Sequence, residues 1–189
     1  MTGTATFTGP QDCYRLSLTR DLSPGGGWRK TLGSVMLNPS TADGSKDDPT
    51  IRRCLGFARA WGFHQLVVRN LIPYRATSPD DLWQWLAAVD QPELDDILGR
   101  NRLLLGSLTA RADYVVVAWG STCPSGKHPA RLRYDLARYA AEHRLMANAH
   151  PGRLICLGTT RDGFPRHPLY VGKRVRAVTW SEPGMGGGR

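Results

Sequence analysis

No stretch of this sequence stays apolar for the roughly 18 residues that a membrane-spanning helix needs. The first ten residues also lack the charged and then apolar pattern of a signal peptide. We therefore expect a cytoplasmic protein without membrane contact. With 189 residues, the chain is long enough to bury one core, and we expect a monomer.

Several widespread catalytic and cofactor motifs are missing as well. The sequence has no Gly-x-Gly-x-x-Gly fingerprint, no Walker loop, no Gly-x-Ser-x-Gly elbow and no His-Glu-x-x-His helix. These absences weaken assignments to nucleotide-cofactor enzymes, serine hydrolases and zinc proteases. The four cysteines are far apart, which favours free thiols over a zinc site or disulfides. We expect no metal and no cofactor.

Acidic residues are scarce relative to basic ones. The chain has 25 Lys and Arg against 16 Asp and Glu, a formal charge of +9 and a pI near 9.9. Such an excess favours phosphate-bearing partners, because cations that bind nucleic acid release its counterions. The same excess also fits a merely soluble basic surface.

Short apolar runs alternate along the chain with helical patterns. An alternating segment at 13–19 comes first, and four apolar runs follow at 34–37, 65–70, 114–118 and 153–157. Short apolar runs of this kind are typical of parallel strands that are buried on both faces.

The sequence therefore predicts the α/β class, as a single three-layer α/β/α domain. Its centre would be a four-stranded parallel sheet, with an N-terminal antiparallel strand or hairpin added. We place this catalytic domain at residues 13–180, between a flexible N-terminal tail at 1–12 and a flexible Gly-rich tail at 181–189.

Two helix starts are clear from capping residues. Asp48 before Pro49 fits an N-cap followed by the first helical residue, and Ser78 with Asp81 three residues on fits a second start. A later basic helix shows an apolar face at Leu132, Leu136 and Tyr139.

Each predicted core strand is followed by a polar or aromatic residue. These residues are Asn38, Asn70, Trp119 and, slightly later, His167. Ligands of open α/β sheets bind just outside the carboxyl ends of the strands, so we expect these side chains to converge on one site.

The residue types at these positions suit chemistry on a nucleobase. An Asn side chain offers a donor and an acceptor, so it can read the edge of a base or orient a water molecule. A His can donate to a leaving group that gains negative charge. Plainer interpretations stay open: Asn38 can close a turn, Asp48 can be only a helix cap, and His167 can be structural.

Several longer motifs carry a family resemblance. They are MLNPSTAD at 36–43, DDPTIRR at 47–53, NL at 70–71, YRA at 74–76 and RHPLY at 166–170. Through them, about residues 13–171 closely resemble a bacterial domain-of-unknown-function family, number 1643. That family name conveys no chemistry by itself.

A more distant resemblance links the chain to the uracil-DNA glycosylase superfamily, through LNP at 37–39, VRN at 68–70 and HPL at 167–169. In that superfamily the first motif places a water-activating residue, the second contains an Asn that reads the base, and the third carries a His that supports the departing base. The resemblance implies a uracil-DNA-glycosylase-like fold. Met36 and Leu169 replace the usual Gly and Ser, which points to a base other than uracil.

Together these observations predict a monofunctional DNA glycosylase that hydrolyses the N-glycosidic bond of a flipped-out damaged or modified base and leaves an abasic site. The partner would be single- or double-stranded DNA, and a modified base of phage DNA would make this an anti-phage defence enzyme. The expected catalytic residues are Asn38, Asp48, Asp43 and His167. The expected base-binding residues are Asn70, Tyr74, Trp119, Pro39 and Ser40. The expected contacts to the DNA backbone are Lys127, His128, Arg131 and Arg166.

Two alternatives remain. One is a hydrolase that cleaves the same bond in free nucleosides or nucleotides. The other is a non-enzymatic nucleic-acid-binding module that uses the arginines of the basic helix, namely Arg131, Arg133, Arg138 and Arg144.

Overall fold

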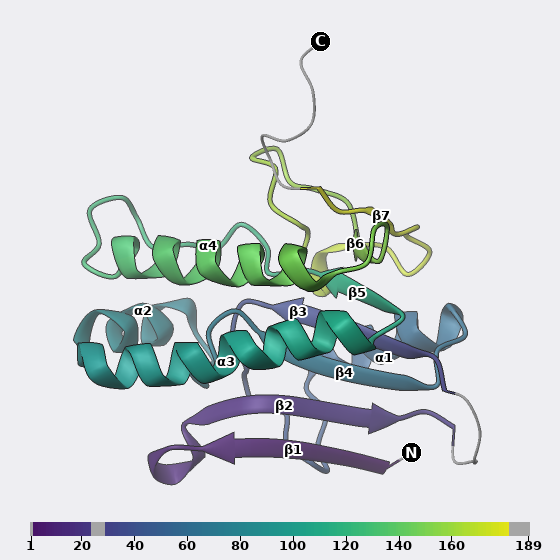
Figure 1. Cartoon of the computed structure of the whole chain (residues 1–189), viewed down its shortest axis with the longest axis horizontal. Coiled ribbons are helices and arrows are strands. Elements are labelled where there is room, and N and C mark those ends of the chain that lie inside the picture. The colour runs from purple at the N-terminus through teal and green to yellow at the C-terminus, as the bar shows by residue number, and fades with distance from the viewer. Residues whose placement is uncertain (1, 24–28, 182–189) are drawn as a thin grey trace.

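The computed structural model describes residues 2–23 and 29–181. Within them, a single mixed sheet has the strand order β1-β2-β4-β3-β5-β6-β7 (Figure 1). The strands are β1 (Thr2–Thr8), β2 (Tyr14–Asp21), β3 (Thr31–Met36), β4 (Gln65–Asn70), β5 (Tyr114–Val117), β6 (Leu154–Cys156) and β7 (Val178–Thr179).

The predicted fold class, a central four-stranded parallel sheet of the uracil-DNA-glycosylase type, is wrong. The sheet has seven strands, and its β1–β2, β2–β4 and β6–β7 pairings are antiparallel. The pairs β3–β4, β3–β5 and β5–β6 run parallel. Apolar runs reveal only strands that are buried on both faces, so the short, exposed β7 left no signal in the sequence.

The N-terminal tail predicted at 1–12 is also wrong. Thr2–Thr8 form β1, which pairs along its whole length with β2. The strand is largely exposed, and its stability comes from main-chain hydrogen bonds and β-branched threonines rather than from a buried apolar face. Of the tail predicted at 181–189, residues 182–189 lie outside the described residues.

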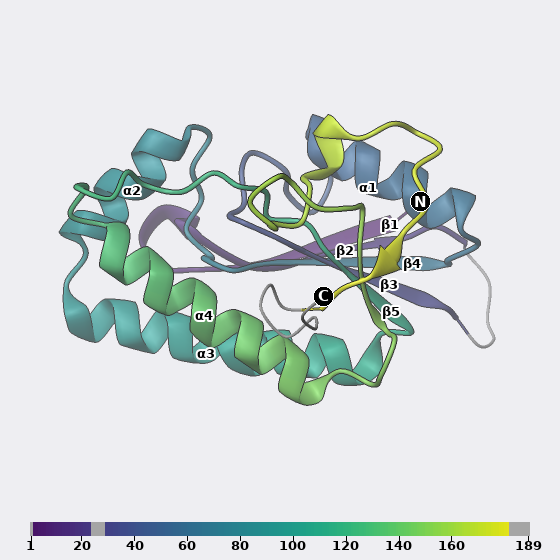
Figure 2. The same cartoon turned by 90° about the horizontal axis from the view of Figure 1, so that it is seen from above.

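Four helices of the described chain cover both faces of the sheet. Helix α1 (Pro49–Ala60) lies on one face, whereas α2 (Pro79–Ala88), α3 (Gln91–Arg111) and α4 (Arg131–Asn148) lie on the other (Figure 2). Each face has its own buried core, exemplified by Leu66 beneath α1 and Leu105 on the side of α3. Full burial of such a side chain contributes about 1.5–3 kcal/mol to the stability of the fold.

The capping residues start their helices as predicted. A side-chain oxygen of Asp48 accepts a hydrogen bond from the main-chain N–H of Ile51 at 2.8 Å, and the hydroxyl of Ser78 accepts one from Asp81 at 3.1 Å. Since Asp48 opens α1 directly after the loop that follows β3, the cap lies at the carboxyl end of the sheet.

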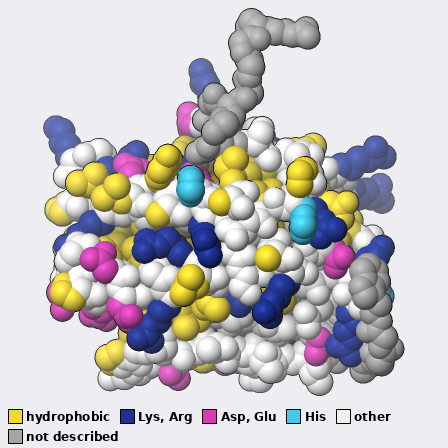
Figure 3. Space-filling view, in the orientation of Figure 1, with side chains coloured by type: hydrophobic (Ala, Val, Ile, Leu, Met, Phe, Trp, Pro, Cys, Tyr) yellow, Lys and Arg dark blue, Asp and Glu magenta, His cyan; other side chains and the backbone are white. Residues whose placement is uncertain are grey.

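The apolar face predicted for α4 is wrong. Leu132, Leu136 and Tyr139 are 68 %, 61 % and 60 % exposed, and the helix instead buries Tyr134, Ala137, Ala141 and Leu145. The small alanines of that second face let α4 pack against α3. Hydrophobic and basic side chains are consequently interspersed on the outer surface of this layer (Figure 3).

None of the helices in the described part of the chain is both long and apolar enough to traverse a bilayer.

Candidate active site

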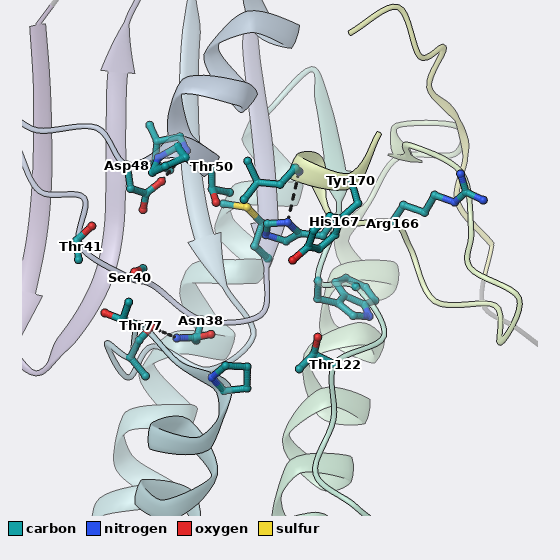
Figure 4. Close-up of a pocket in the computed structure, with 18 of the residues that line it drawn as sticks. Asn38, Ser40, Thr41, Asp48, Thr50, Thr77, Thr122, Arg166, His167 and Tyr170 are labelled. Carbon is teal, nitrogen blue, oxygen red and sulfur yellow. Dashed lines mark hydrogen bonds between the residues drawn. The ribbon is translucent and has the colours of Figure 1, made fainter. Parts of the chain in front are cut away.

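A cavity of about 590 Å³ opens at the carboxyl ends of β3 and β5. Its wall comes from the loops after these strands, from the starts of α1 and α2, and from the 3-10 turn η2 (Pro168–Tyr170) (Figure 4). Of the residues predicted from the sequence, it contains Asn38, Ser40, Asp48, Trp119, Arg166 and His167.

Asn38 is held by its amide nitrogen. Nδ2 donates to the carbonyl oxygens of Pro39 and Ala76, each at 2.9 Å, and both partners are acceptors, so the orientation of the amide is fixed. Its Oδ1 has no hydrogen-bond partner among the described residues and is left as an acceptor on the cavity wall (Figure 4). The side chain therefore both braces the loop and offers an acceptor to a ligand.

Asp48 combines its capping role with a place in the cavity. One oxygen accepts the bond from Ile51, while Oδ2 has no hydrogen-bond partner within residues 2–23 and 29–181. The cap fixes the carboxylate at the helix start, where the positive end of the α1 dipole favours negative charge. One oxygen thus remains for chemistry.

The prediction that Asp43 shares this site is wrong. Its carboxylate accepts main-chain bonds from Ser45 at 2.8 Å and Lys46 at 2.7 Å, and these bonds lower its pKa. The neighbouring Asp47 pairs with the buried Arg20 at 2.8 Å. These two acidic residues shape the loop before α1, and only Asp48 reaches the cavity.

His167 lies at the entrance to η2, opposite Asn38 (Figure 4). Burial lowers the pKa of its imidazole, although the negative charge of Asp48 partly opposes that shift. The ring is therefore neutral at neutral pH. Because Nδ1 accepts a hydrogen bond from the N–H of Leu169 at 3.4 Å, the proton resides on Nε2, which can donate.

Arg53 of α1 holds the turn that carries His167. Its guanidinium donates to the carbonyl oxygen of Pro168 at 3.3 Å and to that of Val171. A charged, two-point contact of this kind fixes η2 against α1. The imidazole of His167 and the carboxylate of Asp48 are therefore both positioned by α1.

Arg15 of β2 also lines the cavity and is only 2 % exposed. It donates from Nη1 to the carbonyl oxygen of Ala42 at 2.9 Å and from Nη2 to Oδ1 of Asn70 at 3.4 Å. Burial lowers its pKa to about 10, although the negative charge of Asp48 opposes that shift. Its Nε is buried without a partner in the described chain.

The base-reading role predicted for Asn70 is not supported by its position. Asn70 is buried, does not line the cavity, and lies behind Arg15. Tyr74 is also outside the cavity, since its ring stacks on Trp85 with centroids 4.4 Å apart. Pro39 is buried and contributes its carbonyl to Asn38. The prediction that these three contact a ligand is wrong in position.

Aromatic residues nevertheless contribute to the cavity. Trp119 lines its wall, contacts Trp180 edge-on with centroids 5.7 Å apart, and leaves its indole N–H buried without a partner in the described chain. Leu169 and Tyr170, on η2, are 44 % and 82 % exposed. The cavity therefore has a buried aromatic wall and an exposed apolar rim.

Of the four residues predicted to contact the DNA backbone, one lines the cavity and three do not. Arg166 lines the cavity, although its Nε donates to the carbonyl oxygen of Thr159, and Figure 4 shows its guanidinium turned away from Asn38. Lys127, His128 and Arg131 lie outside the lining, and Arg131 is paired with Asp135 at 2.6 Å.

Most of the arginines on which the binding-module alternative relies are engaged within the protein. Arg133 donates to the carbonyl oxygens of Leu86 and Val89, and Arg138 pairs with Glu142. Arg144 packs against Gly106, where even a Cβ atom would lie 2.6 Å from its Nε. These guanidiniums stabilise α4 within the protein, so they are poorly placed to bind phosphates.

Three contributors to the site were missed by sequence reasoning. Arg15 sits in an alternating strand, where a polar residue is expected to face water, and nothing local in the sequence shows that the loop at 40–48 covers it. Arg53 and Tyr170 belong to the motifs DDPTIRR and RHPLY, but only the fold shows that Arg53 binds the turn carrying His167 and that Tyr170 is exposed beside the cavity. Within the described residues, no group of three or more His, Cys, Asp and Glu could hold a metal ion.

The comparisons with known proteins give one result. A family model described as "Protein of unknown function (DUF1643)" matches residues 15–169, which include nearly all of the cavity. Neither the curated proteins nor the solved structures contain a match. The distant likeness to uracil-DNA glycosylases therefore stays a prediction.

Proposed function

Because the chain belongs to the family described as "Protein of unknown function (DUF1643)", a description that names no activity, its chemistry has to come from the cavity, and we propose that it is a DNA glycosylase. The substrate is a nucleotide flipped out of the DNA stack, and the products are a free base and an abasic site. The base is damaged or modified, as in some phage DNAs, and excision then serves defence.

One observation carries this proposal: acceptors and a neutral donor face each other across one cavity. Asp48 and Asn38 present free oxygens, and the neutral ring of His167 presents an N–H (Figure 4). Hydrolysis of an N-glycosidic bond needs acceptors for the protons of the attacking water and a donor for the departing base.

The reaction follows from these positions. The bond between C1′ and the base nitrogen breaks, and its electron pair leaves with the base. Nε2–H of His167 hydrogen-bonds the anionic base, while the negative charge of Asp48 stabilises the oxocarbenium-like sugar. Water, held by Oδ1 of Asn38, then bonds to C1′ and gives a proton to Asp48.

The rim favours a polymeric substrate over a free nucleotide. Leu169 and Tyr170 are large apolar side chains exposed beside the cavity on a turn that Arg53 fixes. Exposed aromatics next to a pocket suit stacking on the bases that flank a flipped nucleotide. A mononucleotide, which has no flanking bases, would leave them unused.

The decisive experiment scores abasic sites after incubation with a panel of modified and phage DNAs. We expect Asn38→Ala and Asp48→Asn each to lose about 10²-fold or more in rate, as for a positioned catalytic group. Asp48→Asn should stay folded, because Asn caps a helix about as well as Asp.

Asp43→Asn is the matched control, since this carboxylate lies in the same loop but outside the cavity. Its rate should equal that of the unmodified protein. Equal rates for Asp48→Asn and Asp43→Asn on a cleaved substrate would remove Asp48 from the mechanism, and the absence of abasic sites on every DNA would reject the glycosylase.

A further inference from the structure

Unused N–H donors are found in residues that form or back the inner wall of the cavity. Two lining residues, Arg15 and Trp119, each have a buried nitrogen without a partner in the described chain. Nδ2 of Asn70, directly behind Arg15, is buried and unpartnered as well. Unsatisfied buried donors cost about 1–3 kcal/mol each, and acceptors supplied by a ligand or by water in the cavity would remove that cost.

Arg20 shows what a purely structural arginine looks like on the same strand. It is equally buried, at 2 % exposure, but its guanidinium pairs with Asp47 and also donates to the carbonyl oxygens of Thr19, Asp43 and Lys46. Every nitrogen of Arg20 is therefore used, and its charge is compensated.

Arg15 differs from Arg20 on both counts. Only two of its five N–H groups are engaged, and it forms no ion pair with any residue of the described chain. Removing a cation from water without a direct counter-ion is costly, and natural proteins pair such groups. The charged residues of the cavity lining are Arg15, Arg166 and Asp48, and the guanidinium of Arg166 is turned away from Asn38 (Figure 4), so Asp48 is the one carboxylate of the lining that opposes the charge of Arg15.

We propose that Arg15 is an oxyanion receptor, and that the substrate carries a carboxylate or phosphate group that binds its free N–H donors inside the cavity. The planar fork of a guanidinium matches the geometry of both groups. The identity of the substrate as a nucleotide rests on the proposed function, whereas anion binding by itself does not.

Two sources of the oxyanion fit this chemistry. It is either a charged substituent on the modified base or the phosphate attached to the sugar. In the first case Arg15 selects the modification, and in the second it anchors any nucleotide whose sugar enters the cavity.

The direct test follows the Nε–H resonance of Arg15 by NMR while inorganic phosphate, and separately acetate, is added to the unmodified protein. We expect a saturable shift at millimolar anion that chloride at equal ionic strength does not cause. This measurement needs no variant, so it holds even if changes at Arg15 impair folding.

Arg15→Lys then keeps the charge but removes the fork, and anion binding should weaken at least about tenfold. Arg69→Lys is the matched control, because Arg69 is a half-buried arginine whose Nε is also unpartnered in the described chain, but it lies outside the cavity lining. Its anion affinity should be unchanged. Equal weakening in both variants, or no saturable shift in the unmodified protein, would overturn the receptor.

Substrate pairs distinguish the two sources. Preference for a 5-carboxycytosine oligonucleotide over its 5-methylcytosine counterpart identifies the base substituent, whereas tighter binding of thymidine 5′-monophosphate than of thymidine identifies the phosphate. Anion binding without abasic sites on any DNA would retain the receptor and reject the glycosylase. Abasic-site formation without anion binding would retain the glycosylase and reject the receptor.

Discussion

Burial sets the charge of His167 and so decides how it can act. A neutral imidazole donates a hydrogen bond without adding a positive charge to the cavity, which suits a departing base that becomes an anion. Asp48 opposes the effect of burial, because its negative charge raises the pKa of the imidazole. The pKa of His167 therefore depends on Asp48, and a change at Asp48 is measurable at His167.

This balance makes a prediction about pH. The pKa of His167 is lower in the folded protein than its ordinary value of about 6.5, so the folded state resists protonation more than the unfolded chain does. Stability from this residue is complete above that value and is lost as the pH falls through the lower, folded pKa.

Unfolding free energies between about pH 5 and 8 should therefore fall on the acid side for the unmodified protein, and less so for His167→Gln. The control is His143→Gln, which alters an exposed His of α4 and should keep the acid-side loss. Asp48→Asn should lower the pKa of His167 further in an NMR titration. A rise there would show that the two groups do not interact as the geometry implies.

At the scale of elements, η2 joins the imidazole of His167 to the rim. His167, Pro168 and Tyr170 follow one another closely on this turn, where His167 supplies the donor and Tyr170 is exposed. Arg53 of α1 anchors the turn through its hydrogen bonds to the carbonyl oxygens of Pro168 and Val171. In the proposed glycosylase, this one short segment would set both the approach of DNA and the position of the donor.

Tyr170→Ser tests the rim without touching the core. Because the side chain is 82 % exposed, the melting temperature should hardly change. Duplex DNA should bind more weakly by about 1–3 kcal/mol, the usual value of one base–aromatic stack.

Tyr139→Ser removes a tyrosine of similar exposure from α4, outside the cavity lining, and should leave DNA binding intact. Equal DNA affinity for the two variants would contradict a role for the rim.

The elements also show what the sequence can and cannot predict. Caps are local, so Asp48 and Ser78 were correctly identified as helix starts. Strand pairing is not local, and neither the antiparallel β2–β4 contact nor β7 could be read from periodicity. On α4 two faces have similar spacing, and only the packing against α3 selects the alanine face.

The site follows the same division. Residues directly after β3 and β5 reached the cavity, since the sheet itself places them there. Asn70 did not, because its side chain is covered by Arg15 from the neighbouring β2. Asp43 did not either, because its carboxylate accepts hydrogen bonds within its own loop. Whether a polar residue faces a ligand or another element depends on contacts that are distant in sequence.

At the scale of the whole molecule, the charge of +9 should govern the encounter with DNA. If DNA is the substrate, log affinity should fall with log salt at about −0.9 per phosphate neutralised on duplex. Lys127, exposed in the loop between β5 and α4, should contribute one such contact, and Lys127→Gln should flatten the slope accordingly.

Lys30→Gln is the control, because Lys30 precedes β3 at the amino ends of the parallel strands, away from the cavity. It should leave the slope unchanged. A shallow slope in the unmodified protein, together with cleavage of a mononucleotide at least as fast as that of DNA, would instead favour the free-nucleotide hydrolase.

The cavity draws on almost the whole length of the chain, from Arg15 in β2 to Tyr170 in η2. Ribosomes add roughly 5–20 residues per second, so the floor of the cavity is synthesised seconds before its donor and rim. A nascent chain that already displays Asn38 and Asp48 still lacks His167. The proposed glycosylase would therefore be unable to act on nucleic acid before its chain has been synthesised as far as His167.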